Sequence, residues 1–144
     1  MYSVAGKMYH SICNPDGHSH YITLRGKNGA GKSDCVERMI EYLVNVSIDP
    51  NNSELGTRLS MASSILDAFT HVRSINNISS SRCCRRITMS FDQNHGTLKE
   101  WNINIPLLDT GGLTGYWNEN EKNFHIFHYI LNGMTDEELY NEMG

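Results

Sequence analysis

Apolar residues recur with a helical period in the first half of the chain. One stripe occupies positions i, i+3, i+4, i+7 and i+8, and its members are Val36, Met39, Ile40, Leu43 and Val44. Asp49-Pro50 follows this stripe, as is typical of a helix end. A second stripe consists of Ala62, Ile65, Leu66 and Phe69. The pattern therefore predicts one helix that ends near Val46 and another over 56–70.

Several other segments have the pattern of strands. The run 20–24, His-Tyr-Ile-Thr-Leu, is β-branched and aromatic, which predicts a buried strand. Two alternating runs flank Asn94-His95-Gly96, a sequence with turn chemistry, and they predict an antiparallel hairpin over 86–107. The polar, serine-rich stretch 74–86 is expected to be a loop. Beyond the hairpin, apolar residues share one helical face, which predicts a helix over 122–132.

The composition limits the class of protein. The chain has 144 residues, of which 39% are hydrophobic and 19% charged, as in one globular domain. Its net charge of -4 provides no basic field for nucleic acid. Residues 1–10 lack the apolar core of a signal peptide, and no apolar run approaches the length that spans a membrane. We therefore expect a cytoplasmic α/β chain that has no membrane span and binds no nucleic acid.

The segment 26–33, Gly-Lys-Asn-Gly-Ala-Gly-Lys-Ser, carries the clearest chemistry, because it fills every fixed position of the P-loop pattern G-x-x-x-x-G-K-[ST]. In such a loop the glycines let backbone N–H groups approach phosphates. Lys32 would supply a positive charge to the outer phosphates, and Ser33 would offer a hydroxyl to Mg²⁺. The segment, which we call the P-loop, also precedes a helix whose N-terminus favours anions. A nucleoside triphosphate is the ligand that this pattern predicts.

The order of motifs resembles the nucleotide-binding part of a myosin motor head. Members of that family read close to G-E-S-G-A-G-K-T at the P-loop, then L-E-A-F, then N-x-N-S-S-R-F-G-K in the loop called switch I. Here 66–69 reads Leu-Asp-Ala-Phe and 77–82 reads Asn-Ile-Ser-Ser-Ser-Arg, in the same register. The segment 121–128 is similar to the family's E-R-N-Y-H-I-F-Y. The resemblance implies a myosin-type P-loop NTPase fold, with a partial mixed sheet, flanking helices and an antiparallel hairpin.

The resemblance also implies ATP and Mg²⁺ as cofactors and assigns roles to individual residues. Ser81 would join Ser33 as a ligand of the metal, and Ser80 would lie beside the terminal phosphate and the attacking water. Arg82 would pair with a glutamate of switch II, so that Lys32, Ser80 and Arg82 form the catalytic set. The implied cofactor-binding residues are Gly26, Lys27, Asn28, Gly29, Ala30, Gly31, Lys32, Ser33, Asp34, Asn77, Ser80 and Ser81.

Departures from the family pattern favour an alternative. Ser79 replaces an asparagine of switch I, Cys83-Cys84 replace Phe-Gly, and Lys27 replaces a glutamate. The switch II motif D-x-x-G-F-E and the actin-binding surfaces have no counterpart in the sequence, so actin filaments would be bound through other parts of a head. The chain is therefore expected to act either as part of a cytoskeletal motor that hydrolyses ATP or as a nucleotide-binding scaffold without turnover.

A compact P-loop GTPase or kinase-like enzyme is a further alternative. It needs an acidic residue near the magnesium ion, and the sequence offers two. Asp109 precedes Thr110-Gly111-Gly112 and so resembles the D-x-x-G of GTPases, whereas Asp92 ends a strand-like run. Pro106 would interrupt a central strand before Asp109, and no N-K-x-D guanine motif is present.

Overall fold

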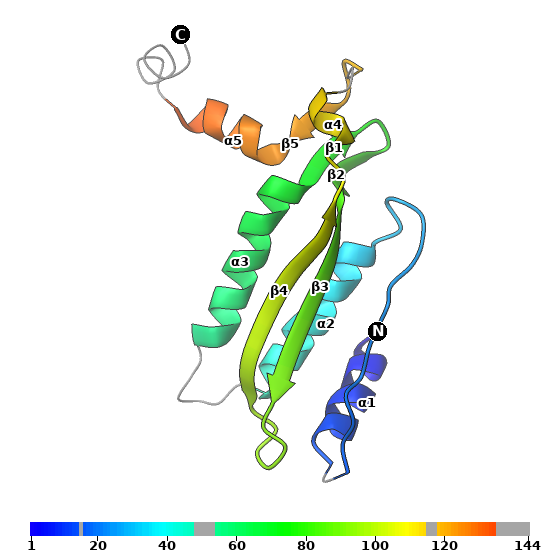
Figure 1. Cartoon of the computed structure of the whole chain (residues 1–144), viewed down its shortest axis with the longest axis vertical. Coiled ribbons are helices and arrows are strands. Elements are labelled where there is room, and N and C mark those ends of the chain that lie inside the picture. The colour runs from blue at the N-terminus through cyan, green and yellow to red at the C-terminus, as the bar shows by residue number, and fades with distance from the viewer. Residues whose placement is uncertain (15, 48–53, 115–117, 135–144) are drawn as a thin grey trace.

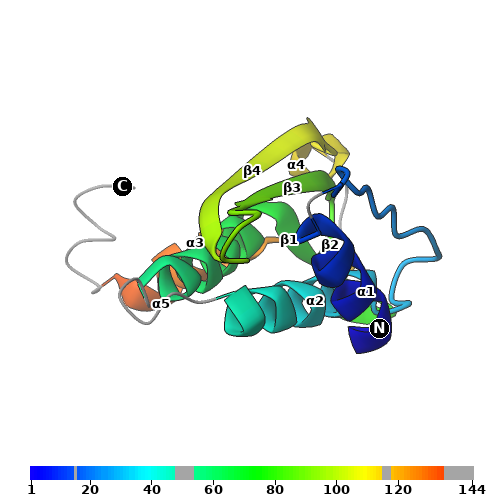
Figure 2. The same cartoon turned by 90° about the horizontal axis from the view of Figure 1, so that it is seen from below.

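A computed structural model describes residues 1–14, 16–47, 54–114 and 118–134. A long β-hairpin lies across three helices in two layers (Figures 1 and 2). The helices are α1 (Tyr2–Ile12), α2 (Lys32–Ser47) and α3 (Glu54–Thr70), and the hairpin consists of β3 (Cys83–Phe91) and β4 (Leu98–Leu108). The two helices expected from the apolar stripes correspond to α2 and α3, and the expected hairpin corresponds to β3 and β4.

The core lies where the hairpin meets the helices. Met39 and Leu43 of α2 pack with Ala5 of α1, while Val44, Leu59 and Leu98 form a second buried cluster. Met89 and Phe91 of β3 touch both clusters and join them. Each strand of the hairpin presents alternate residues to this core, because side chains point to opposite faces of a strand.

A separate small sheet lies at the end of α3. Its strand order is β2-β1-β5, with β1 at His71–Ser74, β2 at Asn77–Ser81 and β5 at Lys122–Phe124, and both pairings are antiparallel. The short helix α4 (Gly111–Thr114) precedes β5, and α5 (His125–Gly133) follows it. Figure 1 shows this sheet above the hairpin, next to the segment that leads into α2.

The expected strand at 20–24 is not formed, and the prediction was wrong. These residues have no ladder partner in the described part of the chain, and Tyr21 is 93% exposed. A strand needs a neighbour to pair its N–H and C=O groups, and β-propensity alone does not supply one. Every described strand pairing is antiparallel, so the α/β composition is confirmed but the expected mixed sheet is not.

The segment 74–86 is also a correction, because strands replace most of the expected loop. Residues 77–81 form β2, which pairs back onto β1 through a tight turn, and β3 begins at Cys83. Backbone pairing can therefore order a polar sequence that has no apolar alternation. The expected helix over 122–132 begins later, at His125, because 122–124 pair with β1 as β5. The predicted helix end at Asp49-Pro50 lies outside the described residues.

Candidate functional site

The P-loop leads directly into α2, and its last two residues, Lys32 and Ser33, are the first two of that helix. Gly29 and Gly31 both have a φ of 76°, a left-handed conformation that side chains disfavour. The Lys32 ammonium folds back over the loop and donates to the carbonyl oxygens of Gly26 and Lys27, at 2.8 and 2.7 Å. An ammonium group has three N–H donors, so one remains for an anion. The loop thus offers positive charge and helix-terminal N–H groups on one surface.

The switch strand, which we define as β2, lies next to the P-loop. A Cβ atom built on Gly29 would lie 3.8 Å from Asn77 Nδ2. The other end of the Asn77 amide is fixed, because its Oδ1 accepts a hydrogen bond from Ser79 N at 3.2 Å. The structure therefore brings Asn77 to the P-loop, and the absence of a side chain at Gly29 leaves open the space between them.

The other predicted ligand residues belong to two segments, α2 and β2. Ser80 is buried on β2 at 3% exposure, and Ser81 Oγ lies 3.5 Å from Cys83 Sγ. Ser33 is exposed at the start of α2. Hydroxyl oxygens are hard donors of the kind that Mg²⁺ accepts beside phosphate oxygens and water, so Ser33 and Ser81 fit the ion chemically. Within the described ranges no hydrogen bond joins these two serines.

The remaining P-loop residues are placed as follows. Lys27, Asn28 and Ala30 are exposed, but the Ala30 N–H donates to Lys27 O at 3.3 Å and is therefore engaged within the loop. Asp34 is engaged elsewhere, since both of its carboxylate oxygens accept from Arg38 Nε at 3.0–3.1 Å. Asp34 therefore belongs to a surface ion pair within α2.

Arg82 has a partner that the sequence did not predict. Its Nη1 lies 3.9 Å from Asp109 Oδ2, and the backbone N–H of Asp109 donates to Arg82 O at 2.7 Å. Asp109 also accepts a hydrogen bond from Gly111 N at 3.0 Å. It thus follows an antiparallel strand and caps a turn, which gives the compact GTPase interpretation no support.

Asp92, the other acidic candidate, has a structural role in the hairpin turn. Its carboxylate accepts from the N–H groups of Asn94 and His95, and Lys99 Nζ lies 2.9 Å from its Oδ2. The Lys99 ammonium and these two N–H groups hold the pKa of Asp92 well below its usual range. Asp92 is therefore an ionised turn residue of the hairpin.

A partly buried polar cluster at the C-terminal end of α3 could not be recognised as a unit from the sequence. Asp67 of α3 contacts both His71 of β1 and Arg85 of β3. Burial lowers the pKa of His71, and the neighbouring Asp67 carboxylate opposes that change only in part. The spacing of Asp67 and His71 by four residues at the end of a predicted helix could have indicated their contact. No local pattern could have placed Arg85 beside them.

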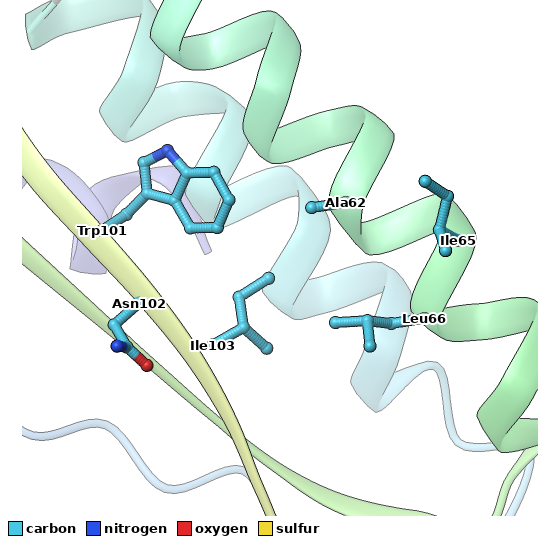
Figure 3. A pocket seen from close by; sticks show the side chains of 6 residues that line it. All are labelled: Ala62, Ile65, Leu66, Trp101, Asn102 and Ile103. Carbon is cyan, nitrogen blue, oxygen red and sulfur yellow. The ribbon is translucent and has the colours of Figure 1, made fainter.

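A groove lies between α3 and β4, away from the P-loop residues. It has a volume of about 420 Å³, and Figure 3 shows the side chains around it. The lining residues are Ala62, Ile65, Leu66, Trp101, Asn102 and Ile103. None of the predicted site residues lines this groove, and its mostly apolar character does not suit phosphates.

These features define an α/β chain with a P-loop, a switch strand beside it and a hairpin that follows. The family model described as "Myosin head (motor domain)" matches residues 1–143. The chain belongs to the myosin head family, as part of a motor domain. The resemblance inferred from the motifs is therefore confirmed.

Curated relatives agree with the family match at low identity. Myosin-51 of Schizosaccharomyces pombe is 30% identical over 142 residues, and these cover 96% of this chain and 9% of that protein. Unconventional myosin-Ih of Homo sapiens is 30% identical over 140 residues, covering 96% of this chain and 13% of that protein. Myosin IE heavy chain of Dictyostelium discoideum is 27% identical over 146 residues, which cover 100% of this chain and 14% of that protein. The chain thus spans only a small part of these relatives. In its described part, no helix combines the length and apolarity needed to cross a membrane.

Proposed function

We propose that this chain binds Mg-ATP between the P-loop and the switch strand, as the nucleotide-binding part of an actin-based myosin motor. The observation that carries this proposal is the approach of Asn77 Nδ2 to within 3.8 Å of the Cβ position of Gly29. Two segments distant in the sequence meet there, and both present hydrogen-bond donors. Membership of the myosin head family supports ATP as the nucleotide.

Each wall of the proposed site contributes different groups. The P-loop provides the Lys32 ammonium and the N–H groups at the start of α2, which bind phosphate oxygens. The switch strand provides the Asn77 amide, and the hydroxyl groups of Ser33 and Ser81 would hold the magnesium ion. Bound Mg²⁺ neutralises charge on the phosphates, while the residues of the chain orient them.

Hydrolysis, in the complete head, would transfer the terminal phosphoryl group to water. Lys32 would stabilise the charge on the transferred group, and Ser80 would position the water for in-line attack. Arg82 would help to close the site around them. Actin binding and a cytoskeletal location come into the proposal through the family, and they involve the whole motor rather than residues identified in this chain.

The proposal is tested by equilibrium binding of a fluorescent ATP analogue in the presence of Mg²⁺. Lys32→Ala should weaken binding about 10- to 100-fold, because a charge-assisted contact to phosphate is lost. Lys7→Ala removes an exposed lysine from α1 and serves as the matched control, with no change expected. Equal affinities of the two variants, or no binding by the unmodified chain, would refute the proposal.

A non-cycling scaffold is the second candidate, and the pairing of Arg82 with Asp109 favours it. An arginine held by Asp109 is less available to close the site over ATP. A single-turnover assay separates the two functions, since the scaffold retains bound ATP whereas the motor releases phosphate. Faster phosphate release from Asp109→Asn than from the unmodified chain would show that this ion pair restrains turnover.

A further inference from the structure

The position of the switch strand depends on the strand beside it. In the described sheet β2 is an edge strand, and β1 is its sole ladder partner there. Ser80 lies opposite Val72, and Ser81 lies opposite His71. Whatever holds β1 in place therefore also sets where the two serines lie relative to the P-loop.

The beginning of β1 is held at the C-terminal end of α3. His71 is 4% exposed, and its Nδ1 lies 3.5 Å from Asp67 Oδ1, 3.2 Å from Asp67 O and 3.3 Å from Thr70 Oγ1. The end of the switch strand is held at the same place, because Arg82 N donates to Thr70 O at 2.8 Å. Both ends of the β1–β2 unit thus return to the last turn of α3 (Figure 1).

The Asp67 carboxylate also holds β3, the strand that follows the switch strand. Arg85 of β3 pairs through Nη2 with Asp67 Oδ1, and its Nη1 donates to Ser63 Oγ at 3.0 Å. The side chains of Arg85 and Asp67 are 16% and 32% exposed, so this pair is more shielded from solvent than the surface pairs of α2 and α3. A shielded pair holds its geometry more firmly than an exposed one.

We infer that Asp67 is a positioning residue for the magnesium side of the nucleotide site. Its carboxylate links His71, before the switch strand, to Arg85, after it, and so holds in place the strand that carries Ser80 and Ser81 and that reaches the P-loop at Asn77. This inference rests on the proposed function. Asp67 forms no hydrogen bond or ion pair with Lys32, which donates to the carbonyl oxygens of Gly26 and Lys27, so no described contact of this kind joins Asp67 to the Lys32 side of the site.

The first test compares ATP affinity with Mg²⁺ and with EDTA. Asp67→Asn preserves the shape of the side chain but removes its charge. We expect the gain in ATP affinity that Mg²⁺ provides to become about tenfold smaller, because losing a residue that supports metal ligands typically weakens metal binding by this amount. Its affinity for Mg²⁺-free ATP should stay unchanged, because the P-loop is intact. Asp67→Glu keeps the charge and should retain most of the tightening. Glu54→Gln, the same kind of change at an exposed site on α3, should have no effect.

The second test is hydrogen exchange without nucleotide. Asp67→Asn should speed exchange of the Arg82 amide and of residues 77–81, while the amides paired between β3 and β4 around Met89 stay protected. Should Asp67→Asn not fold, Arg85→Gln breaks the same pair from the other side and should give the same two effects.

Three results would overturn the inference. The first is that Mg²⁺ raises the ATP affinity of Asp67→Asn as much as it raises that of the unmodified chain. The second is that Asp67→Asn weakens ATP binding equally with and without Mg²⁺. The third is that hydrogen exchange in the switch strand does not change in Asp67→Asn. If the unmodified chain does not bind Mg-ATP, the proposed function fails, and the exchange measurement alone decides whether Asp67 holds the switch strand.

Discussion

The packing of the hairpin turn requires a glycine at position 96. Its φ is 67°, and an added Cβ would lie 2.5 Å from Tyr9 Oη, which donates to Gly96 O at 2.7 Å. We expect Gly96→Ala to lower the free energy of unfolding by about 1–3 kcal/mol, because both strain and a clash result. Gly133→Ala, where a Cβ meets nothing within 4 Å, is the control. Equal urea midpoints for the two variants would contradict this account of the turn.

His71 makes stability depend on pH in a direction that its surroundings determine. Burial lowers its pKa, Arg85 and His125 add to the lowering, and Asp67 opposes it. Below pH of about 6.5 the unfolded chain therefore takes up a proton that the folded protein resists. The free energy of unfolding should fall as the pH decreases from about 6.5 toward the lowered pKa, and above that range this loss is absent.

Urea unfolding at about pH 7.5 and about pH 5.5 measures this effect. His71→Asn should show a smaller loss of stability between the two pH values than the unmodified chain. His18→Asn changes an exposed histidine and should behave like the unmodified chain. The same loss in all three proteins would show that His71 does not contribute.

Among the elements, helix α3 is held in place by the face that packs against the core. Leu59 is 2% exposed and packs in a buried cluster, whereas Met61 on the same helix is 60% exposed. Leu59→Ala should cost about 2–4 kcal/mol of unfolding free energy, and Met61→Ala less than about 0.5 kcal/mol. Thermal or urea unfolding of both variants checks the difference. Similar losses would mean that α3 does not pack on the hairpin as described.

Elements whose partners lie close in the sequence could be predicted from it. The stripe from Val36 to Val44 and the alternation around Ile87 and Ile103 report local geometry, so α2 and the hairpin follow from periodicity. The segment 20–24 and the switch strand could not be predicted, because strand formation depends on a neighbour that the local sequence does not specify.

The same distinction applies to the candidate site. The P-loop is a continuous sequence pattern, and two of its glycines, Gly29 and Gly31, have the left-handed φ that glycine allows. The meeting of Asn77 with Gly29 depends on the whole fold, and only the order of family motifs indicated it. The contacts of Asp67 with His71 and Arg85 join three elements, and a periodic pattern carries no information about such a junction.

At the scale of the whole molecule, much apolar surface remains exposed. Ile65, Phe69, Ile78 and Leu107 are each more than half exposed. Exposed apolar side chains in this number favour association, so the isolated chain should self-associate in sedimentation experiments. Ile65→Glu should reduce self-association, whereas Ser64→Glu, which adds the same charge next to it, should reduce it less. A monomeric unmodified chain at high concentration would contradict this expectation.

In the proposed function, the P-loop and the switch strand form two walls of one Mg-ATP site. A double-mutant cycle of Ser33→Ala and Ser81→Ala, measured as Mg-ATP affinity, tests it most directly. If both serines hold the same ion, the double variant should lose less than the sum of the single losses, with a coupling energy of at least about 0.5 kcal/mol. Ser33→Ala combined with Ser90→Ala, a change at an exposed position of β3, should be additive. Additive losses for Ser33 and Ser81, or no loss at either, would contradict a shared site.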